Sequence, residues 1–150
     1  TDLTIEPEAD GSAPWIDASS GMDEWLPKAR LRIGEQVRDR HFAQSIRIGH
    51  GPVKAAELTL TITSTSGMCT NDAIYLEHLG SWKFAWNSPI KALVGDWRGG
   101  MTRTLRLDLA RLTDQAGNAV DLRPYLEDGL LDVVIQDDTA IDSMSIRIVR

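Results

Sequence analysis

Alternation of apolar and polar side chains along short runs is the feature that most constrains what this chain can fold into. The cleanest run spans residues 58–63, where Leu58, Leu60 and Ile62 alternate with threonines. A period of two places every second side chain on the same face of a β-strand, whereas a helix requires a period near 3.6. The run therefore predicts a strand with one buried face.

Similar runs recur along the chain, separated by glycine, proline and other turn residues. The segments predicted as strands are 28–33, 42–48, 58–63, 73–79, 82–86, 104–109, 131–135 and 143–148. About eight strands at roughly 8–12-residue spacing are typical of an antiparallel β-sandwich of the jelly-roll type. We therefore expect an all-β fold, with a longer excursion between Pro89 and Arg103.

Three of these segments carry more detailed expectations. The almost continuously apolar run 131–135 predicts a central strand. In 82–86 the three aromatic residues, at every second position, are expected to share one face. Helical periodicity is weak, and only residues 35–41 and 123–128 favour a short turn of helix.

Charge divides the chain into two parts. The 150 residues carry a formal net charge of −6, but residues 1–27 alone hold seven acids and no base. Residues 28–54 follow with seven bases and two acids, a local charge of +5. We predict an extended acidic arm over 1–27 and a sandwich domain over 28–150. The arm is either a solvated leader or a segment that docks on the basic face of its own or a neighbouring copy, anchored by Trp15 and Trp25.

Several classes of protein are disfavoured. The sequence has no apolar run of membrane-spanning length, and its one cysteine, Cys69, excludes an internal disulfide and a multi-cysteine zinc site. The acidic balance and missing motifs disfavour nucleic acid. The sequence contains no serine-nucleophile, phosphate-loop or histidine-metal motif, so we expect no enzyme unless the fold places Glu77, His78 and Arg106 in one cleft.

Two acidic loops are candidates for a calcium site. Asn71 and Asp72 precede one predicted strand, and Asp137 and Asp138 follow another. Calcium takes six to eight oxygen ligands from flexible loops, so these four residues could hold Ca²⁺ if the loops emerge at the same end of the sandwich. Asn and Asp are also common turn residues that bond their own backbone, which is the alternative interpretation.

A glycine-rich loop is a second candidate site. Trp97 lies between Asp96 and Arg98, with glycines on both sides. An exposed indole beside these charges would suit sugar stacking or insertion at a lipid interface. The alternative is an indole folded back to cap the sandwich.

The order of motifs from Ala55 to Arg111 resembles the PLAT (lipoxygenase-homology) domain. The resemblance is carried by the strand 58–63, the segment 70–76, Gly99-Gly100 and the strand 104–109, and the closing segment 133–149 also fits. The family usually has a tryptophan before its last strand, where this chain has residues 141–143. The resemblance implies an eight-stranded antiparallel sandwich, with Asp72 at the family's calcium-loop aspartate, in a non-catalytic module that contacts membranes, lipids or proteins.

Taken together, the sequence predicts a soluble, non-catalytic binding or targeting module whose loops recognise a carbohydrate, a lipid surface or a protein, with Ca²⁺ as the candidate cofactor. We expect it to be secreted or at the cell surface, although its first residues show no signal peptide. The alternative is a structural subunit of a shell, surface layer or filament, whose acidic arm contacts a neighbouring copy and makes a homo-oligomer.

Overall fold

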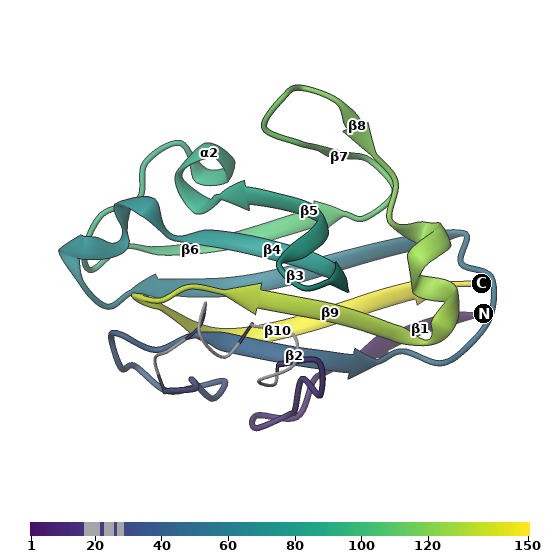
Figure 1. Cartoon of the computed structure of the whole chain (residues 1–150), viewed down its shortest axis with the longest axis horizontal. Coiled ribbons are helices and arrows are strands. Elements are labelled where there is room, and N and C mark those ends of the chain that lie inside the picture. The colour runs from purple at the N-terminus through teal and green to yellow at the C-terminus, as the bar shows by residue number, and fades with distance from the viewer. Residues whose placement is uncertain (17–21, 23–25, 27–28) are drawn as a thin grey trace.

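The chain folds into two four-stranded antiparallel sheets packed face to face (Figure 1). The computed structural model describes residues 1–16, 22, 26 and 29–150. The strand order is β1-β10-β3-β6 in sheet 1 and β2-β9-β4-β5 in sheet 2. These strands are β1 (Asp2–Ile5), β2 (Phe42–Arg47), β3 (Ala55–Ser64), β4 (Ala73–Gly80), β5 (Lys83–Pro89), β6 (Thr102–Asp108), β9 (Leu130–Ile135) and β10 (Thr139–Val149). The predicted antiparallel β-sandwich is confirmed.

Alternating apolar side chains from both sheets fill the space between them. In β3, Leu58, Leu60 and Ile62 are fully buried while the intervening threonines are half-buried. From sheet 2, Leu131 and Val133 of β9 face the same core. β9 lies between β2 and β4, as its apolar sequence predicts for a central strand. Burial of these side chains is the main source of stability.

In the part of the chain that the structure describes, five shorter elements connect the strands of the two sheets. They are η1 (Gly67–Asn71), α2 (Ile90–Val94), the hairpin β7 (Leu112–Thr113) with β8 (Ala119–Val120), and η2 (Arg123–Asp128). The turn of helix predicted over 123–128 is confirmed by η2. The turn predicted over 35–41 is wrong, because this segment is irregular and Asp39 has a positive φ of 63°, which interrupts a right-handed helix.

The predicted strand 28–33 does not form in its described part, residues 29–33. Its one ladder contact is an isolated bridge between Arg30 and His41. Leu31 is buried, but the Arg30 guanidinium donates to the carbonyls of Gly11 and Ala43, which joins the arm to β2. The apolar alternation therefore marks an irregular crossing segment and not a strand.

The aromatic run 82–86 was predicted to present one face, and this is wrong. Trp86 lies in the main core, Phe84 packs against a separate outer cluster, and Trp82 is 54% exposed and precedes β5. The neighbouring strand β4 explains the break in pattern. Leu76, opposite Trp86, lies in the main core, whereas His78, opposite Phe84, stacks on Trp15. Glu77 between them has a positive φ of 62°, so the two strands change face together at this point.

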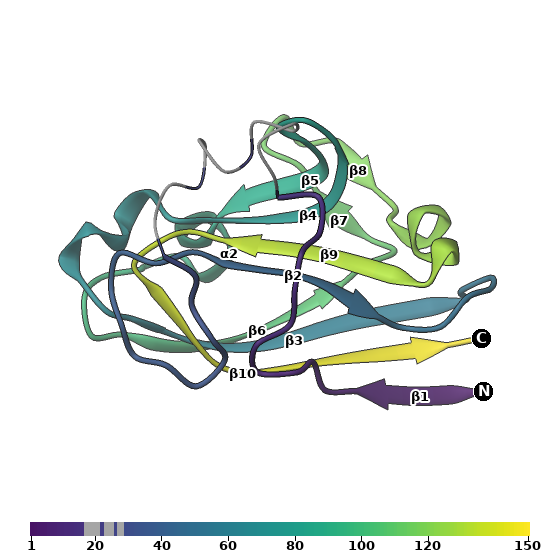
Figure 2. The ribbon, with the colours of Figure 1, turned by 60° about the horizontal axis from the view of Figure 1, so that its bottom comes forward.

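The N-terminal arm is built into the sandwich. β1 pairs with β10 at the edge of sheet 1, and Asp2 forms an ion pair with Arg147. The chain then crosses the outer side of sheet 2 (Figure 2). There Trp15 packs against a second apolar cluster that contains Ala43 and Val134. The arm therefore docks on its own chain in its described part, whereas Trp25 lies outside the described residues.

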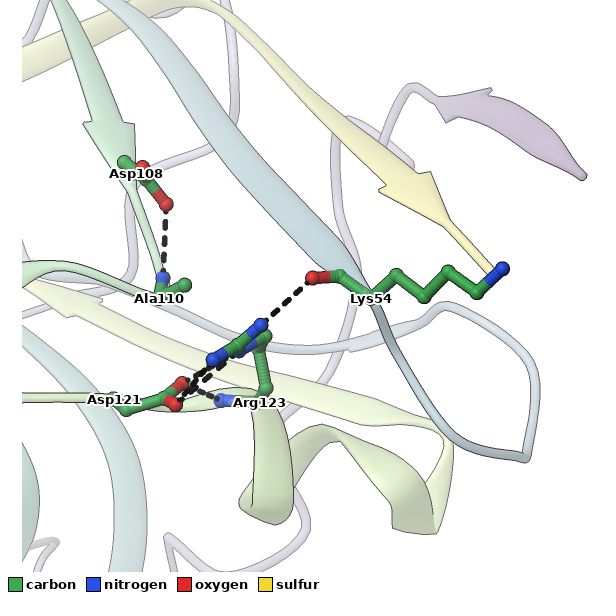
Figure 3. Close-up of polar contacts among 5 residues, drawn as sticks. All are labelled: Lys54, Asp108, Ala110, Asp121 and Arg123. Atoms are coloured by element: carbon green, nitrogen blue, oxygen red, sulfur yellow. Dashed lines mark hydrogen bonds and ion pairs between the residues drawn. The ribbon is translucent and has the colours of Figure 1, made fainter.

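One end of the sandwich is tied together by Arg123 (Figure 3). Its guanidinium donates to both carboxylate oxygens of Asp121 and to the carbonyl of Lys54, which precedes β3. Asp108, at the end of β6, accepts from the backbone N–H of Ala110 at 3.0 Å. Both chain termini and η2 lie at this end, and η1 and the β9–β10 turn lie at the other (Figure 1).

Candidate functional site

The two acidic loops singled out in the sequence meet at one end of the sandwich. β4 and β9 are antiparallel neighbours, with Ile74 opposite Ile135. The residues just before β4 therefore lie beside those just after β9, and the backbone N–H of Gln136 donates to the carbonyl of Ala73. Asp72 is thereby brought to the turn that joins β9 to β10. The condition set for a metal site in the sequence, that the two loops emerge at the same end of the sandwich, is therefore met.

Asp72 is a buried carboxylate at the centre of this end. Its side chain accepts from the backbone N–H of Asp138 at 3.0 Å and from the hydroxyl of Thr139 at 2.7 Å. The residue is only 2% exposed. Loss of hydration raises the pKa of Asp72 to about 7, and the neighbouring Asp137 adds to the rise. Asp72 therefore exchanges its proton near neutral pH.

Asp137 and Asp138 complete an acidic cluster with Asp72. One carboxylate oxygen from each of the three residues lies within 4.8 Å of the others. Asp138 is 8% exposed and accepts from the backbone N–H of Asp39 at 3.1 Å. Burial raises the pKa of Asp138, and Asp137 contributes in the same direction. Proximity of three carboxylates disfavours the fully ionised state unless a cation joins them.

A cavity of about 350 Å³ opens on Asp137 and Asp138 of the acidic cluster, whereas Asp72 does not line it. It is lined by Asn71, Asp137 and Asp138, with Arg38, Asp39, Ser66 and Met68 around them. Asn71 lies in η1 and is exposed, so its amide oxygen is available to the cavity. All four residues predicted for a metal site are therefore at this end.

The chemistry of the donors distinguishes among metals. The acidic cluster offers only carboxylate oxygens. Sets made only of oxygen suit hard cations such as Ca²⁺, whereas structural zinc sites are built from Cys and His ligands. Asp142, which precedes the last predicted strand, is used differently, because it accepts from the hydroxyl of Thr63 at 2.6 Å and from the Gln36 amide. The acidic cluster therefore offers the type of donor that hard cations prefer.

The second predicted site is not supported by the position of its tryptophan. The Trp97 side chain is only 1% exposed and belongs to the main core, so it cannot stack on a ligand at the surface. Its backbone carbonyl lies 3.8 Å from the thiol of Cys69, beneath η1. Asp96 and Arg98 are exposed and pair with each other at 2.9 Å. The indole folds back because an apolar ring gains more from the core than from the loop surface.

The cleft that would favour an enzyme is not formed by the residues proposed for it. Glu77 and His78 lie on β4 of sheet 2, whereas Arg106 lies on β6 of sheet 1 and pairs with Thr59. Glu77 is 3% exposed and accepts from the backbone N–H of Asp132 at 3.0 Å. Burial raises the pKa of Glu77 to about 8. The three side chains therefore have no common site.

Sequence reasoning missed a polar surface on β2 and β9. Ser45 and Asp132 are joined by a 2.6 Å hydrogen bond, and the Trp15 indole donates to both. A signal for this surface was present in the sequence. Asp132 is the single charged residue in the apolar run 130–135, which is unexpected in a strand buried on both faces.

Comparisons with known proteins are sparse. No family model matches the sequence, and no curated protein matches it. One solved structure, a "xylan-binding module CBM15", superposes on 100% of this chain and 99% of its own, with a TM-score of 0.47 and 13% identity. Similarity at this level carries no inference about this chain, and the PLAT resemblance gains no specific support. Within the described residues, no helix is long and apolar enough to span a membrane.

Proposed function

We propose that this protein is a non-catalytic β-sandwich binding module that holds Ca²⁺ at the acidic cluster. The observation that carries the proposal is the convergence of Asp72, Asp137 and Asp138 from two loops distant in sequence. The cation would be bound by these carboxylates, with Asn71 at the rim of the same cavity. Calcium supplies charge neutralisation and rigidity there and performs no chemical step.

The electrostatic environment of Asp72 favours a cation site over the alternative that these aspartates only stabilise turns. An aspartate that only bonds its own turn need not be buried, and Asp114 is only half-buried where it accepts from the backbone N–H groups of Ala116 and Asn118. Asp72 is instead buried beside a second buried carboxylate, and its pKa is raised. A bound cation offsets the cost of ionising two neighbouring buried carboxylates, because it stabilises both in their ionised forms.

The contacts made by the described residues of the arm do not favour the assembly hypothesis. In its described part the arm pairs with β10 and places Trp15 on sheet 2 of the same chain. The binding-module proposal includes a secreted or cell-surface location. Extracellular calcium-binding modules have Kd values of about 10⁻⁴–10⁻³ M. A carbohydrate, lipid surface or protein would be the partner of such a module.

Thermal unfolding with and without calcium tests the proposal. At about a hundredfold excess over Kd, Ca²⁺ stabilises the folded state by about 2.7 kcal/mol, which raises the Tm by about 5–10 °C for a chain of this size. EDTA should reverse the shift. In Asp72→Asn the shift should disappear, while the amide oxygen still accepts from Thr139 and preserves the fold.

The matched control is Asp96→Asn, which removes an exposed carboxylate at the same end of the molecule. This variant should keep the full calcium shift. An equal Tm in calcium and EDTA for the wild-type chain would contradict the proposal, as would an undiminished shift in Asp72→Asn.

A further inference from the structure

A groove lies between the N-terminal arm and strand β2, well away from the acidic cluster. Two adjoining cavities of about 360 and 470 Å³ form it. Both are lined by Ser12 of the arm and by Ser45 and Arg47 of β2. Each volume is within the range of about 300–1,000 Å³ found for sites that bind small organic ligands. We call this surface the arm groove; Figure 2 shows the arm crossing β2.

Trp15 forms a fixed aromatic wall of the arm groove. Its ring stacks on His78 with centroids 4.5 Å apart and planes 14° apart, and it meets Phe84 edge-on. Its N–H donates to Ser45 at 2.7 Å and to Asp132 at 3.2 Å. An aromatic ring held in this way loses little further conformational freedom when a ligand binds.

The larger cavity combines this indole with other apolar and polar groups. Pro14 and Leu130 extend the apolar wall, and Asp132 and Arg47 provide the charged groups. Arg47 is exposed, and its guanidinium can donate two parallel hydrogen bonds. Carboxylates accept in a similar bidentate way. An apolar face with paired donors and acceptors at its edge matches a pyranose ring, which has apolar C–H faces and neighbouring hydroxyls.

The smaller cavity continues the polar lining along the arm. Glu6 and Glu8 contribute carboxylates, and Gln44 lies between arm and strand. With Asp132, three acidic side chains face the groove and Arg47 is the cation among the lining residues described. This balance disfavours a polyanion and is compatible with a neutral ligand.

Backbone groups along β2 disfavour a peptide added as an extra strand. The N–H of Ser45 donates to the carbonyl of Ser12 at 2.8 Å. The carbonyl of Ala43 accepts from Arg30 at 3.0 Å, and the side-chain Nε2 of Gln44 donates to the carbonyl of Glu8 at 2.7 Å, which holds the arm over this strand. The edge of β2 is therefore already paired at these positions, and strand addition requires free backbone groups. Recognition in the arm groove would depend on side chains.

We propose that the arm groove binds a neutral oligosaccharide, with one sugar ring against Trp15 and its hydroxyls bonded to Arg47 and Asp132. The proposal rests on the proposed function in treating the protein as a binding module, and it does not require the cation. It moves the sugar site from the loop of Trp97 to the outer side of sheet 2.

Calorimetric titration of the full chain with xylohexaose, cellohexaose and mannohexaose tests this site, with an oligogalacturonate as the charged comparison. At least one neutral hexasaccharide should bind. Trp15→Ala should abolish binding, and Arg47→Ala should weaken it about tenfold, since it removes charge-assisted hydrogen bonds. Arg106→Ala, an exposed arginine on the other sheet, should leave the affinity unchanged.

The outcomes separate this proposal from the calcium proposal. Titrations in Ca²⁺ and in EDTA should agree, because the groove shares no residue with the acidic cluster. No binding of any neutral hexasaccharide at millimolar concentration would overturn the sugar site, as would preference for the oligogalacturonate. If Trp15→Ala does not fold, Arg47→Ala decides alone, and an unchanged affinity in that variant overturns the proposal.

Discussion

The two ends of the sandwich place aspartates in opposite electrostatic environments. At one end Asp121 is exposed and paired with Arg123, whose guanidinium lowers the pKa of that carboxyl (Figure 3). At the other end Asp72 is buried, accepts from neutral donors and has its pKa raised to about 7. The first carboxylate is neutralised by its own chain, whereas the second requires a proton or an added cation.

This contrast shows why the composition of a loop does not by itself identify a metal site. Both ends contain several aspartates, and both use some of them to accept backbone N–H groups. Burial and mutual proximity are what separate the acidic cluster from the other end. A test of this comparison must therefore change one property at a time: the burial of a side chain, the proximity of carboxylates to one another, or an ion pair.

The largest effect is expected from the packing beneath the acidic cluster. Trp97→Ala should lower the free energy of unfolding by about 3–5 kcal/mol, since it removes a large buried ring. Asp96→Ala and Arg98→Ala, on either side, should each change it by less than about 0.5 kcal/mol. Urea unfolding of the three variants measures this. Equal costs at all three positions would mean that the indole is not buried and would remove the distinction between core and loop.

Glu77 is a buried carboxylate outside the acidic cluster, so it shows the effect of burial without that of the cluster. Glu77 of β4 is buried, and Asp132 of β9 and Asp128 of η2 add to the rise of its pKa to about 8. The folded state therefore keeps a proton that the unfolded chain releases near pH 4.5. The stability that protonated Glu77 contributes is complete below pH 4.5 and is lost as the pH rises through about 8.

Glu77→Gln should remove this loss. In EDTA, the variant should gain about 3 kcal/mol relative to wild type between pH 5 and pH 8.5 in urea unfolding. The calcium shift in Tm should be the same in both proteins. A parallel pH dependence of the two would show that burial of Glu77 does not control its proton.

The smallest effect is expected at the paired end. Arg123→Ala removes the ion pair with Asp121 and the hydrogen bond to the Lys54 carbonyl, both at exposed positions. A slight decrease in Tm should result, smaller in 1 M NaCl than at low salt, because exposed pairs are screened. The calcium response should be unaffected. A decrease as large as that of Trp97→Ala would show that the two ends do not differ as described.

Much of the sandwich could be predicted from local pattern. The runs that became β3, β6, β9 and β10 alternate cleanly or are continuously apolar because one or both faces are buried. β1 was missed because it is a short edge strand, mostly exposed, whose order comes from pairing with β10. The opposite error occurred at residues 28–33, where the alternating pattern predicted a strand but the described part forms only an isolated bridge.

The candidate sites were predictable to different degrees. The four residues predicted for a metal site could be singled out because Asn and Asp at strand ends are visible in sequence. The antiparallel neighbours β4 and β9 bring Asp72, Asp137 and Asp138 together, and Asn71 lines the same cavity as the last two. The burial of Trp97 could not be predicted, because glycines around a tryptophan do not determine whether the ring turns inward. The arm groove depends on Trp15 meeting Ser45 and Asp132 across long separations, which no local pattern encodes.

Direct calcium titration of the metal-free chain tests the central claim most closely. Isothermal calorimetry at pH 8, above the raised pKa of Asp72, should show saturable binding of Ca²⁺ to wild type and to Arg123→Ala. Asp72→Asn and Asp138→Asn should each lose this binding. Absence of saturable binding to the wild-type chain at millimolar Ca²⁺, or unchanged binding in both aspartate variants, would contradict a calcium site at the acidic cluster.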